Sequence, residues 1–191
     1  MRLFVALVPS AHALAELDAA LGERAAEGVR WGRPEQWHLT LAFLGEVDDR
    51  ARTGLCERLA RAAGRHPPPT LALAGGGHFG GRVLWAGVDG DKAGLRRLAE
   101  SVRAAARRCG LPVEQRPYRP HLTLARGRPG ADLAPLAARL AGFVGAPWTA
   151  EELHLVRSRL GAGPDGTARH ETVASWPLTG RPMSGQPHSG R

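Results

Sequence analysis

The chain contains little cysteine, a single lysine and few aromatic residues. Its 191 residues include two cysteines, and Phe, Trp and Tyr together make up 5%. Cys56 and Cys109 lie far apart and form no Cys-x-x-Cys pair, which argues against a disulfide framework and against a cysteine-based zinc or redox site. We expect both to be ordinary small buried side chains in a reducing compartment.

No apolar run approaches the roughly 20 residues that a membrane-spanning helix needs. The apolar stretch at residues 3–8 is too short for the core of a signal peptide, and Pro9 ends it without a cleavage-type sequence. We expect a cytoplasmic monomer that does not contact a membrane.

Several catalytic and nucleotide-binding signatures are also missing. The sequence has no Gly-x-Ser-x-Gly nucleophile turn and no Gly-x-x-x-x-Gly-Lys phosphate loop, so neither Ser-His-Asp chemistry nor use of ATP is expected. The His-x-x-x-His spacing of helical metal sites does not occur either. We therefore expect no metal and no cofactor.

Positive charge is in excess, because 26 Lys and Arg residues face 18 Asp and Glu residues, for a net charge of +8. Lys92 is the only lysine, and the abundance of Ala, Gly and Arg is typical of a GC-rich genome, which weakens charge as a sign of function. A basic surface is nevertheless what RNA binding requires. Charge makes RNA a candidate partner without identifying it.

The tetrapeptide His-Leu-Thr-Leu occurs twice, at residues 38–41 and 121–124. Each copy is typical of a β-strand, in which alternate side chains point to opposite faces. One face then carries an imidazole beside a hydroxyl, and the other carries two leucines. Packing explains the leucines but not the repeated polar pair. The predicted catalytic residues are therefore His38, Thr40, His121 and Thr123.

The remaining histidines have no repeated context. We expect them to be structural or surface residues, namely His12, His66, His78, His154, His170 and His188.

The flanks of the two tetrapeptides repeat one order of elements, with a strand and a helix before each copy and a helix and two strands after it. The expected strands besides the motif strands are residues 3–8, 70–74, 83–88, 153–160 and 170–176. The expected helices begin at Ser10 and Asp91 and span residues 49–65 and 132–143. Glycine-rich turns are expected at residues 75–77 and 161–166.

This pattern predicts an α+β protein with two similar lobes that share or exchange strands. The halves are roughly residues 1–88 and 82–178, within one domain at residues 1–179. Residues 180–191 contain almost no apolar side chains and are expected to form a disordered tail.

Two imidazoles and two hydroxyls suit the hydrolysis of a strained phosphodiester. The reaction needs a base to activate water and an acid to protonate the departing ribose oxygen, and an imidazole with a pKa of about 6.5 can serve as either. The threonine hydroxyls can donate to the non-bridging oxygens. Arg126, five residues after His121, can hold the phosphate or form a structural salt bridge, and Phe43 takes the matching place after His38.

Two aromatic residues lie near the motifs. Tyr118 and Phe79 are predicted to stack on a terminal base, and a place in the core is the alternative for both.

Longer segments around the tetrapeptides carry a family resemblance. Residues 37–45 (WHLTLAFLG) and 118–126 (YRPHLTLAR) resemble the two signature segments of the 2H phosphoesterase superfamily. The most similar branch is the RNA 2′,3′-cyclic phosphodiesterases, also called 2′-5′ RNA ligases, which residues 79–85 and 155–160 resemble as well. The resemblance extends from Met1 to about Leu178.

The resemblance implies a bilobal, pseudo-twofold fold, with two antiparallel or mixed sheets flanked by helices around a central cleft that carries both His-x-Thr motifs. It implies opening of an RNA terminal 2′,3′-cyclic phosphate to a 2′-phosphate without metal or ATP, and the reverse 2′-5′ joining of RNA ends. By position, His38 would be the proton donor and His121 the proton acceptor, although the repeated motif alone permits either assignment.

The sequence does not determine the identity of the substrate. A tRNA fragment, another RNA end or a small cyclic nucleotide would each suit such a cleft. A module that binds nucleotides or RNA ends without turnover is the alternative from a different functional class.

Overall fold

The computed structural model describes residues 1–24, 26–163 and 166–181. Most of the expected tail, from residue 182 on, lies outside the described residues, whereas the backbone N–H of Gly180 donates to the carbonyl oxygen of His66 at 3.0 Å. Residues 164–165 of the expected turn at 161–166 lie outside them as well. None of the described helices combines the length and the apolar character needed to cross a bilayer.

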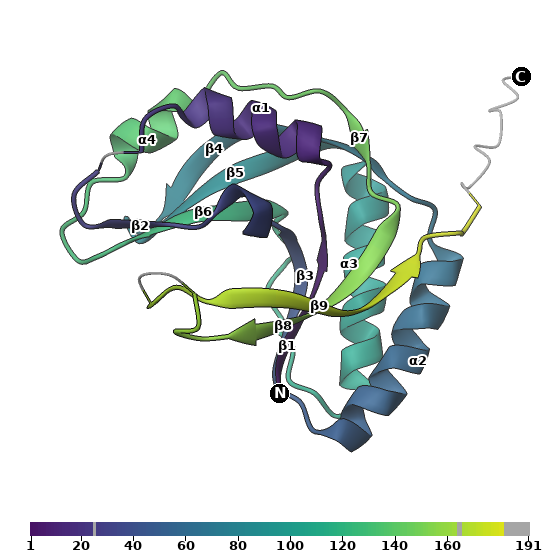
Figure 1. Cartoon of the computed structure of the whole chain (residues 1–191). Coiled ribbons are helices and arrows are strands. Elements are labelled where there is room, and N and C mark those ends of the chain that lie inside the picture. Colours follow the sequence, from purple (N-terminus) through teal and green to yellow (C-terminus); the bar gives the residue numbers. More distant parts are fainter. Residues whose placement is uncertain (25, 164–165, 182–191) are drawn as a thin grey trace, which may run out of the picture.

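Within the described residues, nine strands form one strongly curled antiparallel sheet (Figure 1). The strands are β1 (Arg2–Leu7), β2 (Val29–Trp31), β3 (Leu39–Glu46), β4 (Thr70–Phe79), β5 (Val83–Gly90), β6 (His121–Gly127), β7 (Trp148–Thr149), β8 (Glu152–Arg159) and β9 (Arg169–Pro177). Their order is β7-β4-β5-β6-β3-β1-β8-β9, and β2 pairs with β6. The α+β class is confirmed.

The expectation of two separate sheets is corrected. Strands β3 and β6 join the two halves of the sheet, and in the described part of the chain their ladder consists of the pair Leu39 and Leu122. Further along β6, the edge that β3 leaves free is taken by β2. The two halves are therefore parts of one sheet with a short central seam.

The helices are α1 (Ala11–Leu21), α2 (Asp49–Arg65), α3 (Lys92–Arg107) and α4 (Ala134–Arg139), with a short 3-10 helix η1 (Pro34–Gln36). Side chains cap three of them, since Ser10, Asp48 and Asp91 each accept from a backbone N–H in the first turn. Helix α4 is shorter than expected, because the chain turns after it and Val144 bridges to Ala74 of β4.

The two halves of the sequence exchange strands. Strand β4, from the first half, pairs with β5, and β8, from the second half, pairs with β1. Helices α1 and α4 pack near β4, whereas α2 and α3 pack on each other, α2 near β9 and α3 near β3 (Figure 1). Each half of the sheet is thus built from both halves of the chain.

One large core fills the space between the sheet and the helices, and the motif leucines lie in it as predicted. Leu39, Leu41, Leu122 and Leu124 are at most 1% exposed. Full burial of one such side chain stabilises the fold by about 1.5–3 kcal/mol. This burial fixes which face of each motif strand points away from the core.

The cysteines depart slightly from expectation. Both are free thiols, and they are half-buried rather than buried. Cys56 lies on α2, and Cys109 lies in the turn that follows α3.

The turn expected at residues 75–77 is wrong, because these glycines lie within β4. Gly76 and Gly77 are needed for close packing. A Cβ atom on Gly77 would lie 2.5 Å from Cζ2 of Trp85, and one on Gly76 would lie 2.7 Å from Cβ of Leu140. The chain reverses instead at Gly80 and Gly81, which both have positive φ angles.

Candidate active site

The two His-x-Thr motifs meet at the central seam of the sheet. Leu39 and Leu122 face each other in antiparallel register and point into the core. Because alternate residues change face, the histidines and threonines of both motifs lie on the opposite, half-buried face. The antiparallel register places His38 beside Thr123 and His121 beside Thr40.

The two imidazoles are held in the same way. Nδ1–H of His38 donates to the carbonyl oxygen of Gln36 at 2.8 Å, and Nδ1–H of His121 donates to that of Arg119 at 2.8 Å. A carbonyl oxygen only accepts, so the proton of each neutral ring lies on Nδ1. The Nε2 atom of each ring therefore remains available to exchange a proton with a ligand.

His38 lies in a small aromatic cluster on this face. Its ring stacks on Phe4 at 4.6 Å between centroids, and the edge-on ring of His170 lies 4.9 Å away. The pKa of His38 is lowered to about 4, chiefly by burial and also by the nearby charges of His170 and His121, against the hydrogen bond to Gln36, which raises it. His38 is therefore neutral at neutral pH in the free protein.

The low pKa of His38 makes stability depend on pH. The unfolded chain, in which the pKa of a histidine is about 6.5, binds this proton more tightly than the folded protein does. Unfolding therefore becomes easier as pH falls from about 6.5 toward 4. Between pH 7 and pH 4.5, His38 should lower the free energy of unfolding by at most about 3 kcal/mol. We expect His38→Gln to remove part of this decrease, as measured by urea unfolding at both pH values. An identical pH dependence in parent and variant would show that His38 titrates normally.

His121 has an aromatic neighbour of its own. Phe79 at the end of β4 meets the ring of His121 edge-on at 5.1 Å and stacks on Trp85 at 5.3 Å. Phe79 is 37% exposed. The structure thus brings Phe79 to the site, with part of its surface open to a ligand.

A break in strand alternation brings Arg126 onto the same face as His121. Five residues along a regular strand would place it on the opposite face. Leu124 and Ala125 are both buried, however, and the pairing of β6 with β5 shifts register there, so the alternation slips by one residue. Strand β3 slips in the same way after Thr40, and the 61% exposed Phe43 occupies the place that matches Arg126.

Arg126 has a second arginine beside it. Arg30 of β2 is its register partner, and within the described ranges neither guanidinium forms an ion pair with a carboxylate. The salt bridge considered as the alternative for Arg126 is therefore not found there. Like charges directly opposite on paired strands repel each other, and an anion bound between them would relieve the repulsion.

A cavity of about 460 Å³ adjoins this end of the seam. Arg30, Trp31 and Arg128 line it from the side of β2 and β6, and Thr167 lines it from the connection between β8 and β9. The two arginines make the cavity basic, which suits an anionic ligand that extends beyond the two motifs.

The structure does not support Tyr118 as a stacking residue for a base. Its ring packs against the main core, and the guanidinium of Arg103 on α3 lies 5.4 Å from the ring centre. Its hydroxyl is buried, and burial raises the pKa of that group above its usual range. Tyr118 therefore packs against the core on the side of the sheet that faces α3. This is the alternative considered for the residue.

Sequence reasoning missed two residues of the site. His170, expected to be structural or exposed, contacts the ring of His38, and Arg30 lies opposite Arg126. Neither residue belongs to a repeated motif, and no local pattern places it near the seam. In the described part of the chain, no group of three or more His, Cys, Asp or Glu residues is arranged to hold a metal ion.

Two histidines and two hydroxyls on facing strands, with an arginine beside them, are groups that can transfer protons and bind an anion. Sequence comparison identifies the class of protein that carries them. The sequence model of the 2′-5′ RNA ligase superfamily matches residues 5–162. The chain belongs to this superfamily, which confirms the resemblance to 2H phosphoesterases.

Curated relatives include proteins named RNA 2′,3′-cyclic phosphodiesterase. That of Geobacillus stearothermophilus is 36% identical over 80% of this chain, and the match spans about half of that relative's length, 48%. That of Thermus thermophilus is 34% identical, with 84% of this chain and 83% of the relative aligned.

Solved structures share the fold. The structure of Escherichia coli LigT in apo form is 30% identical, covers 93% of this chain and 97% of that chain, and superposes with a TM-score of 0.76. The structure of LigT complexed with 3′-AMP is 28% identical, covers 93% of this chain and 97% of that chain, and has a TM-score of 0.73. A strongly curled antiparallel sheet flanked by helices is thus common to these proteins.

Proposed function

We propose that this protein opens the terminal 2′,3′-cyclic phosphate of RNA to a 2′-phosphate without metal or ATP. The observation that carries the proposal is the matched pair of imidazoles at the seam, each fixed through Nδ1 to a backbone carbonyl and each left with Nε2 for proton transfer. The names of the relatives support the reaction, and the 3′-AMP complex of LigT supports a nucleotide as the ligand.

The proposed reaction consumes one water molecule. Nε2 of His121 takes a proton from the water as its oxygen attacks phosphorus. The bond between phosphorus and the 3′ oxygen then breaks, and Nε2 of His38 gives a proton to that oxygen. The products are a 2′-phosphomonoester and a 3′-hydroxyl. With the 5′-hydroxyl of a second RNA in place of water, the same steps form a 2′-5′ linkage.

The low pKa of His38 fits this role only when the substrate is bound. An anion close to an imidazole favours its charged form and raises its pKa, so the cyclic phosphate itself promotes protonation of His38. In the free protein His38 becomes protonated only as the pH falls toward 4. When both rings carry a proton, neither can act as base. We therefore expect the acidic limb of kcat/KM to lie near the pKa of His38.

The phosphate is held by the groups that share the face of the histidines. The hydroxyls of Thr40 and Thr123 donate to the non-bridging oxygens, where negative charge develops. Arg126 adds a charge-assisted contact, and Arg30 lies in register to contact the next phosphate along the RNA. Phe79 offers its exposed surface to the terminal base.

The proposal is tested with a short RNA that ends in a 2′,3′-cyclic phosphate, incubated with the protein in EDTA and without ATP. We expect conversion to a 2′-phosphate, identified by mapping the product ester. A 3′-phosphate would contradict the assigned bond cleavage. Turnover of a 2′,3′-cyclic mononucleotide but not of the RNA would support a phosphodiesterase of small nucleotides, and binding without turnover of either would support a binding module.

A further inference from the structure

The net positive charge of the chain is concentrated on one pair of helices. Helices α2 and α3, together with Arg108, which follows α3, contain eleven Arg or Lys residues and three Asp or Glu residues. The rest of the chain contains fifteen of each kind. An excess of positive charge on one surface favours contact with a polyanion.

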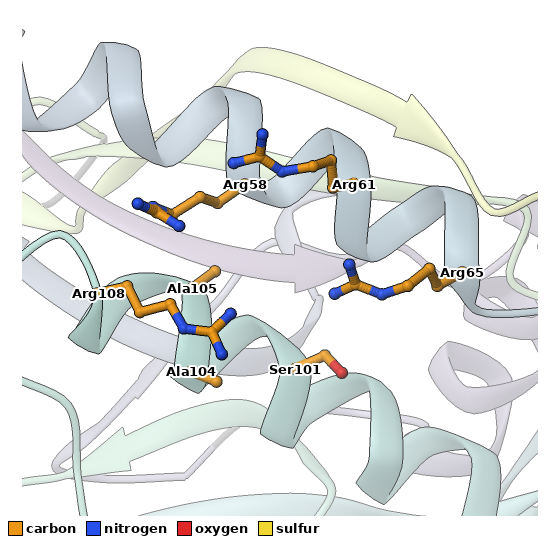
Figure 2. Close-up of a pocket in the computed structure, with 7 residues that line it drawn as sticks. All are labelled: Arg58, Arg61, Arg65, Ser101, Ala104, Ala105 and Arg108. Carbon is orange, nitrogen blue, oxygen red and sulfur yellow. The ribbon is translucent and has the colours of Figure 1, made fainter.

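A pocket between the two helices gathers part of this charge (Figure 2). Its volume is about 170 Å³. Arg58, Arg61 and Arg65 come from one face of α2, and Arg108 reaches back from the end of α3, with Ser101 beside them. The side chains of Ala104 and Ala105 on α3 are small and leave space between the helices. The long arginine side chains surround this space.

The arginines of the pocket have no acidic partners among the described residues. Nearby ion pairs engage other cations, namely Arg52 with Asp49, Lys92 with Asp89 and Arg107 with Glu100. The hydroxyl of Ser101 lies 2.8 Å from Nε2 of His66, so a further polar group borders the pocket. Uncompensated cations around a cavity of this size are suited to a bound oxyanion.

The pocket is separate from the site at the seam. Helix α3 packs over β3 on the core side, where Leu39 and Leu41 share one core with Leu95 and Leu98 of α3. The histidines and threonines of the motifs lie on the other face of the same strands. The reacting end of a substrate therefore cannot occupy both places.

We propose that the α2–α3 pocket binds a backbone phosphate of the RNA at a distance from its cyclic end. This inference rests on the proposed function, because the substrate then brings a chain of phosphates that continues beyond the seam. The pocket contributes affinity for long RNA and takes no part in the chemistry. A cyclic mononucleotide cannot reach it.

The test compares two double variants with equal loss of charge. Arg58→Gln with Arg108→Gln removes cations of the pocket. Arg50→Gln with Arg96→Gln removes exposed cations of the same helices outside its lining and serves as the matched control. Kinetics are measured with a tRNA half that ends in a 2′,3′-cyclic phosphate and with a 2′,3′-cyclic mononucleotide.

For the pocket variant we expect the KM for the tRNA half to rise about tenfold with kcat unchanged. The slope of log KM against log salt should fall by about 0.7, because one phosphate contact is lost. The kinetics on the mononucleotide should not change, and the control variant should shift the KM for the tRNA half far less.

The outcomes that would overturn the proposal differ from those that would overturn the function. If the parent opens neither substrate, the function fails, and binding of a fluorescent RNA with an ordinary 3′ end to both variants still tests the pocket. If the parent turns over RNA and both double variants raise KM equally, or neither does, the pocket is not an RNA site. Should the first variant unfold, Arg61→Gln with Arg65→Gln gives the same comparison.

Discussion

Alanine at His38 or at His121 should lower kcat/KM for RNA with a 2′,3′-cyclic phosphate end by about 10³-fold or more. Each substitution removes one Nε2 atom at the seam, and water, which is neither positioned nor suitably basic or acidic, must replace it. Because the two rings act in one reaction, the double variant should be little slower than the slower single variant. Single-turnover rates at saturating enzyme would measure the chemical step directly.

His12→Ala is the control for these variants. His12 lies on α1, outside the seam, and its exposed ring pairs with Glu16. We expect its activity to match that of the parent. Circular dichroism and urea unfolding of the His38 variant are needed beside the kinetics, since this ring also stacks on Phe4. A folded His38 or His121 variant that keeps activity within tenfold of the parent would contradict the two-histidine mechanism.

A substrate with sulfur in place of the bridging 3′ oxygen should separate the acid from the base. Sulfur leaves as a thiolate without needing a proton, so loss of the acid should matter little. We expect His38→Ala to turn over this substrate within about tenfold of the parent, whereas His121→Ala stays about 10³-fold slower. The measurement is the rate of thiol release for the parent and the two variants.

The experiment with the sulfur substrate shows which histidine is the acid and which is the base. A pH profile cannot show this. Both assignments require one proton shared between His38 and His121, and they therefore give the same bell-shaped curve. Recovery by His121→Ala instead of His38→Ala would reverse the assignment. The neutral state of His38 in the free protein makes this comparison necessary, because a ring with a pKa of about 4 is equally suited to accept a proton before substrate binds.

Local features of the sequence predicted the local structure well. The helix expected at residues 49–65 is α2 itself, and the alternation of His-Leu-Thr-Leu correctly placed the leucines in the core. Capping residues and strand alternation act over a few residues, so one stretch of sequence contains the whole signal. The short strands β2 and β7 lacked such a signal, since each pairs through only two or three residues.

Features that depend on distant contacts were missed or misread. The glycines at 75–77 resemble a turn until Trp85 and Leu140 are placed against them. The single sheet depends on one pair of leucines that lie 83 positions apart in the sequence. His170 and Arg30 join the site through strand pairings of β9 and β2, and the position of Arg126 depends on a slip in alternation within β6. Residue types alone do not reveal these pairings.

The exchange of strands has a consequence for synthesis on the ribosome. β1 emerges before the other strands of the sheet, and β3 can pair with one of its edges soon afterwards. Its other edge waits for β8, which is synthesised much later than β3. Until then the nascent chain presents an apolar strand edge, the kind of surface at which unfinished proteins associate. Completion of this half of the sheet must therefore follow translation of residues 152–159.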